Sequence, residues 1–131
     1  HDAVRPLVTE RSVAAVVRAA MRHGAAAAAL PVKDTVKLEG PRGFTSCTVD
    51  RSALWAMQTP QGFQGKLLLR AHLAAQREGI LGTDETSLVE RLGTAVRLVP
   101  GDERNIKITA RADLDLCRAW LEAGTRGRRT A

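Results

Sequence analysis

The sequence has very few aromatic residues: it contains no tyrosine, and its only aromatics are Phe44, Phe63, Trp55 and Trp120. Proteins that bind single-stranded nucleic acid usually stack bases on exposed aromatic side chains, so this scarcity argues against that function. The net charge of +6 favours a nucleic-acid partner, but three arginines near the C-terminus supply half of it. The rest of the chain is modestly basic, which fits an anionic small molecule as well as a polynucleotide. We expect no nucleic-acid partner.

Motifs for metal binding, redox chemistry and membrane insertion are also missing. Cys47 and Cys117 have no CxxC spacing, which indicates free thiols in a reducing compartment, with a single disulfide as the alternative. His1, His23 and His72 are isolated from one another, so a zinc site is not expected. No apolar run approaches the roughly 20 residues that span a bilayer. With no signal-peptide pattern at the N-terminus, we expect a soluble cytoplasmic protein without a membrane partner.

Helical and strand patterns alternate along the chain. The first helix is expected between an N-cap at Thr9 and a stop at Gly24, and the apolar residues 25–32 indicate a buried parallel-type strand. Further helices are expected over residues 65–78, from Thr83 to Gly93 and from Thr109 to Gly124, and strands over 95–99 and 105–109. This order predicts the α/β class, with a mainly parallel sheet flanked by helices and functional residues at the carboxyl ends of its strands.

Residues 33–49 interrupt this alternation. Polar and apolar residues alternate over 35–39, a Gly-Pro-Arg-Gly turn follows at 40–43, and residues 44–49 again favour a strand. The pattern predicts a β-hairpin. A lone two-stranded hairpin is marginally stable in water, so we expect it to project as an arm and to contact a partner subunit.

Residues 48–63, TVDRSALWAMQTPQGF, carry the most specific pattern. Pro60 disfavours helix at Thr59 and pushes it into an extended conformation, while Gly62 permits backbone geometry closed to other residues. Arg51 and Thr59 both donate hydrogen bonds of the kind that phosphate oxygens accept. Spacing alone favours a surface turn with Arg51 in a salt bridge, and a phosphate-binding segment is the alternative.

Five motifs follow one another in a recognisable order: HDAVRP at 1–6, PVKDTVK at 31–37, TVDRSALWAMQTPQGF at 48–63, GTDETSLVERLG at 82–93 and NIKIT at 105–109. Together they resemble the C-terminal part of 2-C-methyl-D-erythritol 4-phosphate cytidylyltransferases, over nearly all of residues 1–124. The resemblance implies a Rossmann-like fold with a hairpin arm that forms a homodimer. It implies transfer of CMP from CTP, with Mg²⁺, to methylerythritol phosphate, releasing pyrophosphate in non-mevalonate isoprenoid biosynthesis.

The resemblance also implies a division of the chain. Residues 1–124 would be part of a single cytidylyltransferase domain, with residues 33–63 forming the arm, the dimer contact and a substrate-binding segment. We expect residues 125–131 to be a disordered basic tail.

Four residues are assigned to substrate and nucleotide by the resemblance. Asp2 would bind the polyol hydroxyls and lie near the nucleotide, with Ala3 beside the ribose. Arg5 would hold the polyol phosphate, and Thr83 would hydrogen-bond to the substrate. A salt bridge for Arg5 and a helix N-cap role for Thr83 are the structural alternatives.

Three further residues would act on the phosphates. The resemblance implies that Arg51 and Thr59 reach across the dimer to the substrate phosphate of the other subunit, and that Lys107 positions the nucleophilic phosphate. Two phosphates repel as they approach, so cations must neutralise them and hold them in line. A phosphate monoester is already an anionic nucleophile, so no histidine or cysteine base is required. No protein ligand to the metal is assigned.

The sequence departs from the family pattern in one respect, since it has no Gly-rich loop that would cradle the CTP phosphates. It also begins at His1 instead of methionine, which suggests an internal or processed boundary. We expect a fragment that binds CTP poorly and turns over little by itself. Two alternatives stay open: a cytidylyltransferase for another polyol phosphate, such as ribitol 5-phosphate, and a non-catalytic dimerisation or binding fragment of the same fold.

Overall fold

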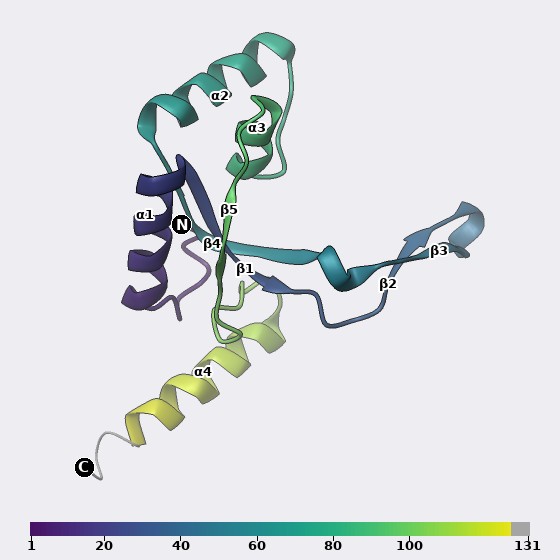
Figure 1. Ribbon diagram of the computed structural model, residues 1–131. Coiled ribbons are helices and arrows are strands. Elements are labelled where there is room, and N and C mark those ends of the chain that lie inside the picture. Colours follow the sequence, from purple (N-terminus) through teal and green to yellow (C-terminus); the bar gives the residue numbers. More distant parts are fainter. Residues whose placement is uncertain (127–131) are drawn as a thin grey trace.

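A computed structural model describes the backbone of residues 1–126 and the side chains of residues 1–123. Its centre is a three-stranded sheet in which β1 (Ala25–Pro31) lies between β4 (Trp55–Phe63) and β5 (Arg97–Pro100) (Figure 1). β1 runs parallel to β5 and antiparallel to β4. The α/β class is confirmed, as are the strands expected near 25–32 and 95–99. The expected mainly parallel sheet is a mixed one in this part of the chain.

The five alanines at 25–29 make β1 the centre of the core, because each is at most 1% exposed. Successive residues of a strand point to opposite faces, and small side chains let helices approach both faces closely. On one face Ala26 and Ala28 pack against Val16 and Ala20 of α1 (Glu10–His23). The predicted cap of this helix is confirmed, since the Thr9 hydroxyl accepts a hydrogen bond from the backbone of Ser12 at 3.1 Å.

The other face of β1 is covered by α2 (Gly65–Glu78) and α3 (Glu85–Arg91). Ala25 packs there against Ala71, Ala75, Leu88 and Val89. The predicted α2 is confirmed, and it ends at Gly79, whose left-handed φ of 66° favours glycine. Both helices lie at the same end of the sheet, where they form one wall of the cavity described below (Figure 1).

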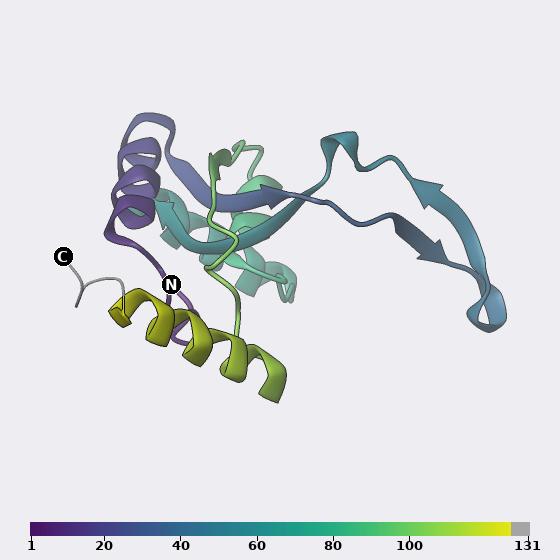
Figure 2. The same ribbon diagram turned by 90° about the horizontal axis from the view of Figure 1, so that it is seen from below.

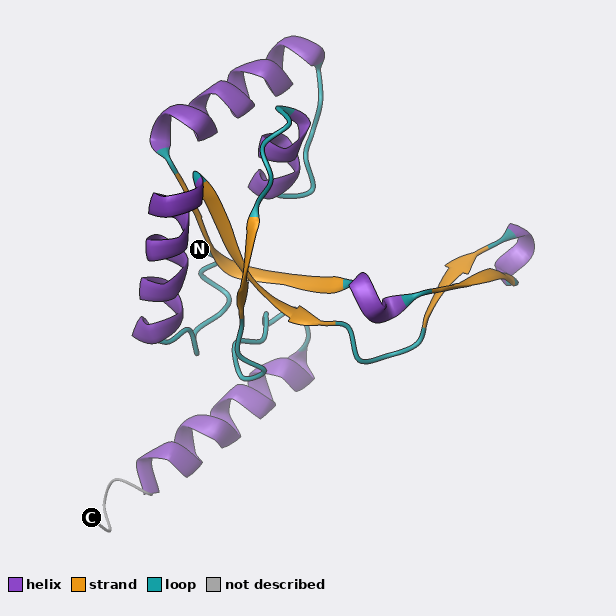
Figure 3. Ribbon diagram, in the orientation of Figure 1, coloured by secondary structure: helices purple, strands orange, loops and turns teal. Residues whose placement is uncertain are grey.

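The predicted hairpin is confirmed. β2 (Val36–Glu39) and β3 (Thr45–Val49) pair in antiparallel fashion, and the short 3-10 helix η1 (Pro41–Gly43) closes the turn. A second short 3-10 helix, η2 (Arg51–Ala53), leads from the arm into β4. The arm extends away from the rest of the chain (Figures 1 and 3). Its side chains are mostly exposed, so this arm leaves a large surface free for contact with another chain.

Strand β4 is absent from the elements predicted above, because Pro60 and Gly62 are typical of turns. Gly62 pairs with Ala26 of β1 and lets α1 approach, because a Cβ there would lie 3.1 Å from Val16; the ladder with β1 also explains why the strand tolerates Pro60. The register shifts between Ala27, which pairs with Gln61, and Ala29, which pairs with Met57. The residues between these pairs therefore form a bulge, where proline does not have to donate a ladder hydrogen bond.

The C-terminal part differs from the prediction in three ways. Residues 105–109 are a loop and not a strand, as Figure 3 shows, and a backbone bond from Ile108 to Val4 of 2.9 Å ties them to the N-terminal loop. Thr109 does not cap α4 (Arg111–Arg126) by accepting from the helix; instead its hydroxyl and amide donate to Asp113. Helix α4 also continues through Gly124, because one glycine costs only about 1 kcal/mol in a helix.

Helix α4 lies apart from the three-stranded sheet in both views (Figures 1 and 2). The predicted disordered tail begins at residue 125, but residues 125 and 126 belong to α4. The remainder of that prediction, residues 127–131, lies outside the described residues. Within residues 1–126, none of the helices is both long enough and apolar enough to cross a bilayer.

Candidate active site

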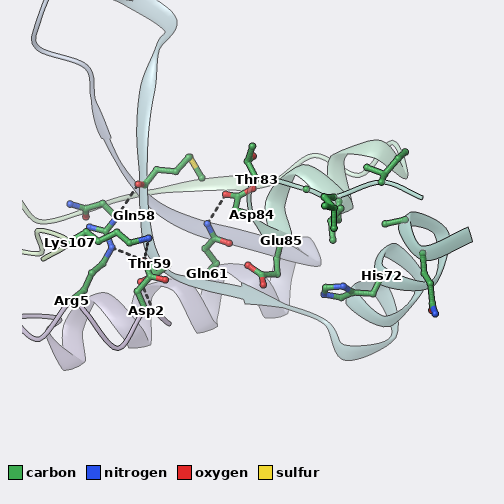
Figure 4. Close-up of a pocket in the computed structure, with 17 residues that line it drawn as sticks. Asp2, Arg5, Gln58, Thr59, Gln61, His72, Thr83, Asp84, Glu85 and Lys107 are labelled. Atoms are coloured by element: carbon green, nitrogen blue, oxygen red, sulfur yellow. Dashed lines mark hydrogen bonds and ion pairs between the residues drawn. The ribbon is translucent and has the colours of Figure 1, made fainter. Parts of the chain in front are cut away.

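An open cavity of about 800 Å³ lies between the N-terminal loop, β4, the α2–α3 region and the loop that follows β5. Five of the seven predicted site residues line it: Asp2, Arg5, Thr59, Thr83 and Lys107 (Figure 4). The two others do not. Ala3 is an exposed neighbour of Asp2, and Arg51 lies in η2 at the base of the arm.

Two cations share one carboxylate at one end of the cavity. Asp2 Oδ2 lies 3.3 Å from Lys107 Nζ and 3.4 Å from Arg5 Nε. Two positive charges and one negative charge make this end of the cavity locally positive, which suits an anionic group, although Asp84 and Glu85 also line the cavity. The Lys107 side chain is 48% exposed, so its ammonium group is accessible from the cavity.

Arg5 is largely occupied by the protein itself. Its side chain is only 11% exposed, Nη1 donates to the backbone oxygen of Asn105 at 2.7 Å, and Nη2 lies 3.5 Å from the backbone oxygen of Met57. Its Nε faces Asp2 as an ion pair without a well-aligned hydrogen bond. The salt bridge considered as an alternative for Arg5 is therefore present, and Lys107 is the more accessible of the two cations.

Thr59 lies beside this charged cluster, in the bulge of β4 (Figure 4). The hydroxyl oxygen accepts from the backbone amide of Asp2 at 3.0 Å and lies 2.9 Å from His1 Nδ1. Bulges commonly redirect side chains next to active sites. The resemblance places Thr59 with Arg51 on the partner's substrate. In the structure Thr59 lines the cavity of its own chain, next to Lys107.

The opposite wall of the cavity contains the start of α3. The N-cap is Asp84 and not Thr83 as predicted: Asp84 Oδ1 accepts from the backbone of Ser87 at 2.9 Å, and Thr86 also donates to the carboxylate. Gln61 of β4 donates to Asp84 Oδ2 at 2.9 Å and joins this wall to the sheet. With the cap provided by its neighbour, Thr83 is exposed at the cavity and available to a ligand.

The charge of Asp84 is stabilised by these contacts. Partial burial acts to raise the pKa of the carboxyl, but the hydrogen bonds from Ser87, Thr86 and Gln61 outweigh it and hold the pKa below its ordinary value of 3.8. Asp84 is therefore ionised at neutral pH, and a negative charge at the start of a helix is favourable.

We expect Asp84→Ala to lower the free energy of unfolding by about 1 kcal/mol, the usual cost of losing an N-cap. Thr83→Ala is the matched control, because the Thr83 side chain is exposed and does not cap the helix. Urea denaturation of both variants measures the difference. Equal loss of stability in the two variants would contradict the assignment of the cap.

The pH dependence of stability should report the same group. A carboxyl whose folded-state pKa is lowered adds stability above its unfolded pKa and loses it as pH falls through the folded value. Wild-type protein should therefore lose stability more steeply below pH 3.8 than Asp84→Asn, which cannot titrate at this position. Parallel stability curves between pH 5 and pH 2, measured by urea denaturation at about one-unit steps, would show that Asp84 is not the titrating group.

Two buried amide side chains, Gln58 and Asn105, are not among the site residues predicted from the sequence; Gln58 lines the cavity, and Asn105 packs against Gln58. Gln58 Nε2 donates to the backbone oxygens of Asp102 at 3.0 Å and Asn105 at 3.3 Å. Asn105 Nδ2 donates to the backbone oxygen of Thr59 at 2.7 Å. Each belongs to one of the five motifs, beside Thr59 or near Lys107, but nothing in the sequence indicates that these amides are buried.

Fold and cavity together define an α/β protein whose polar, cation-containing site suits a phosphorylated ligand that bears hydroxyl groups. Residues 1–123 match the family model of 2-C-methyl-D-erythritol 4-phosphate cytidylyltransferase, IspD. The chain belongs to this family.

Known members of this family are similar to the chain over most of its length. The 2-C-methyl-D-erythritol 4-phosphate cytidylyltransferase of Desulforamulus reducens is 47% identical over 122 residues, 93% of this chain and 52% of the relative. The bifunctional enzyme IspD/IspF of Desulforudis audaxviator is 51% identical over 124 residues, 95% of this chain and 32% of the relative. The crystal structure of the Thermus thermophilus cytidylyltransferase superposes with a TM-score of 0.83 at 42% identity, covering 92% of this chain and 59% of that structure. The chain thus spans about half the length, or less, of these curated relatives.

Proposed function

We propose that the complete protein transfers CMP from CTP to 2-C-methyl-D-erythritol 4-phosphate and releases pyrophosphate, a step of non-mevalonate isoprenoid precursor synthesis. The observation that carries this proposal is the placement of Asp2, Thr59 and Lys107 in one cavity of a chain that belongs to the family. The names of its relatives support the choice of methylerythritol phosphate over ribitol 5-phosphate.

In the proposed reaction a phosphate oxygen of methylerythritol phosphate attacks the α-phosphorus of CTP. A new phosphorus–oxygen bond forms, the bond between the α-phosphorus and the bridging oxygen breaks, and pyrophosphate leaves with the electron pair. No proton has to move, because the attacking phosphate is already anionic. The protein therefore contributes by neutralising charge and holding the two phosphates in line.

The residues around the cavity divide this task. Lys107 places its ammonium group on the attacking phosphate and balances the repulsion between the substrates. Asp2 accepts hydrogen bonds from the polyol hydroxyls, and Thr59 and Thr83 bond to the substrate from opposite walls. Arg5 supports Asp2 and adds positive charge at the edge of the phosphate site. Ala3 lies on the nucleotide side, beside the ribose.

The chemistry of the cavity is compatible with Mg²⁺. No cluster of three metal-ligating side chains is present among the described residues. Mg²⁺ is usually held by one or two carboxylates together with substrate phosphates and water, and Asp2 is a carboxylate in the right cavity to serve. When bound, the ion would neutralise charge on the triphosphate.

The arm provides the proposed contact between two subunits. We place residues 33–63 in the interface of a homodimer and Arg51 on the substrate phosphate of the partner, because Arg51 is exposed at the base of the arm and outside its own cavity. Residues 1–124 act in this proposal as part of one cytidylyltransferase domain. The free thiols of Cys47 and Cys117 agree with a reducing, cytoplasmic location.

A direct assay tests the proposed function. The complete protein, CTP and Mg²⁺ are incubated with methylerythritol phosphate or with ribitol 5-phosphate, and pyrophosphate release is measured. We expect release with methylerythritol phosphate. Release with ribitol 5-phosphate alone would show that ribitol 5-phosphate, and not methylerythritol phosphate, is the substrate. No release with either, together with no CTP binding by calorimetry, would favour a non-catalytic dimerisation module.

A further inference from the structure

The buried amide side chains of Gln58, which lines the cavity, and Asn105 are among the least exposed polar groups of the described chain: Gln58 is 7% exposed and Asn105 is 1% exposed. Burying an amide costs free energy unless its polar atoms find hydrogen-bond partners. The partners of these amides therefore identify the part of the structure that they hold in place.

Asn105 contacts two segments that contribute proposed substrate-binding residues. Its side-chain Nδ2 donates to the backbone oxygen of Thr59 at 2.7 Å, and its backbone oxygen accepts from Arg5 Nη1 at 2.7 Å. Lys107 follows two residues later in the same loop. Figure 4 shows that Arg5, Thr59 and Lys107 lie close together at one end of the cavity. One buried residue thus joins the chain segments that carry all three.

Gln58 fixes Asn105 from the side of β4. Its Nε2 donates to the backbone oxygen of Asn105 at 3.3 Å, and its Oε1 lies 3.4 Å from Asn105 Nδ2. Gly101 allows the loop to approach this amide, because a Cβ at that position would overlap with Gln58 Oε1. The loop is therefore pressed against the Gln58–Asn105 pair.

The loop depends on such side-chain contacts because residues 101–109 form neither strand nor helix. Its backbone is tied to the body at the two ends, from Gly101 to Ala29 at 2.8 Å and from Ile108 to Val4 at 2.9 Å. Between these ends the amide pair connects the loop to β4. We propose that Asn105 is a positioning residue, which sets Lys107 and Thr59 at the distance needed to hold one phosphate between them. This inference rests on the proposed function.

Asn105→Asp tests the role of the donated hydrogen bond with almost no change in size. An ionised carboxylate cannot donate to the Thr59 oxygen and repels it. We expect kcat/KM for methylerythritol phosphate to fall about 100-fold, the effect of misplacing a catalytic group by about 1 Å. The KM for CTP should stay near the wild-type value. The loss should shrink at low pH, because a protonated aspartic acid regains a donor.

A control separates positioning from general loss of stability. Val16→Ala removes bulk from a residue of α1 that is 1% exposed, without touching the amide pair. It should lower Tm and leave kcat/KM unchanged. Gly101→Ala is a second probe in case Asn105→Asp does not fold: its φ is ordinary, so the added Cβ acts only by crowding Gln58 and the Ala29 oxygen. It should reduce kcat/KM in the same direction.

Hydrogen exchange of residues 57–59 and 105–109 in the complete protein measures the positioning without turnover. Faster exchange of both segments in Asn105→Asp or Gly101→Ala, but not in Val16→Ala, supports the inference. This holds even if the wild-type protein releases no pyrophosphate, because that result would overturn only the proposed function. Unchanged exchange in both variants overturns the inference. Faster exchange with unchanged kcat/KM in an active enzyme overturns it too, since the pair would then be purely structural.

Discussion

Replacing Lys107 by alanine is expected to lower kcat/KM for methylerythritol phosphate by about 10²–10³-fold, the usual cost of removing one group that stabilises charge in a transition state. Lys107 is the more accessible cation of the cavity, since Arg5 is committed to the backbone oxygens of Asn105 and Met57. In the proposed reaction, removing Lys107 leaves the attacking phosphate without its counter-charge. Steady-state kinetics with varied methylerythritol phosphate measures the loss.

Lys66→Ala is the control for this prediction. Lys66 of α2 is also an exposed lysine, and it does not line the cavity. Its removal lowers the net charge by the same amount and should leave kcat/KM close to wild type. If both lysine variants lose activity to the same extent, the effect comes from overall charge and the role assigned to Lys107 is wrong.

Arg51→Ala is expected to cause a loss of similar size while CTP binding stays nearly intact, because the proposed target of Arg51 is the second substrate, methylerythritol phosphate. The two lesions should complement each other when the proteins are mixed and allowed to exchange subunits. In a heterodimer of Arg51→Ala with Lys107→Ala, one cavity combines an intact Lys107 with an intact Arg51 from the other chain. Random pairing should restore about one quarter of the wild-type activity.

The control for complementation is a mixture of Arg51→Ala with the double variant that carries both substitutions. No dimer in that mixture contains an intact pair, so activity should stay at the level of the variants. Recovery in the first mixture and none in the second supports a shared site. Absence of recovery in both mixtures, with subunit exchange verified by light scattering or mass spectrometry, would mean that Arg51 does not act across the dimer.

Local patterns in the sequence are enough to predict the elements whose causes are local. Helix α1 follows from its apolar spacing and the Thr9 cap, β1 from an uninterrupted apolar run, and the arm from alternation around a Gly-Pro turn. β4 escapes prediction because its proline is tolerated only through a bulge opposite β1 and its glycine lies against α1, and both are tertiary features. The predicted cap of α3 is wrong by one residue because Thr83 and Asp84 both have the chemistry of an N-cap.

The site is predictable to the extent that its residues fall in recognisable motifs. Asp2, Thr59 and Lys107 are identified from the resemblance, and the structure places them in one cavity. No local pattern indicates that residues 105–109 form a loop, since alternating polar and apolar residues are typical of a strand. Asn105 is also overlooked, because its proposed role depends on burial against Gln58, which only the folded chain creates.

Lys107, Thr59 and Asp2 together form the proposed binding site for the polyol phosphate, and the rest of the mechanism depends on them. A crystal structure of the complete protein with methylerythritol phosphate tests this site most directly. We predict the phosphate within hydrogen-bond distance of Lys107 Nζ and Thr59 Oγ1, and the polyol hydroxyls at Asp2. A phosphate bound elsewhere, with the ammonium group of Lys107 still paired only with Asp2, would contradict the proposed site.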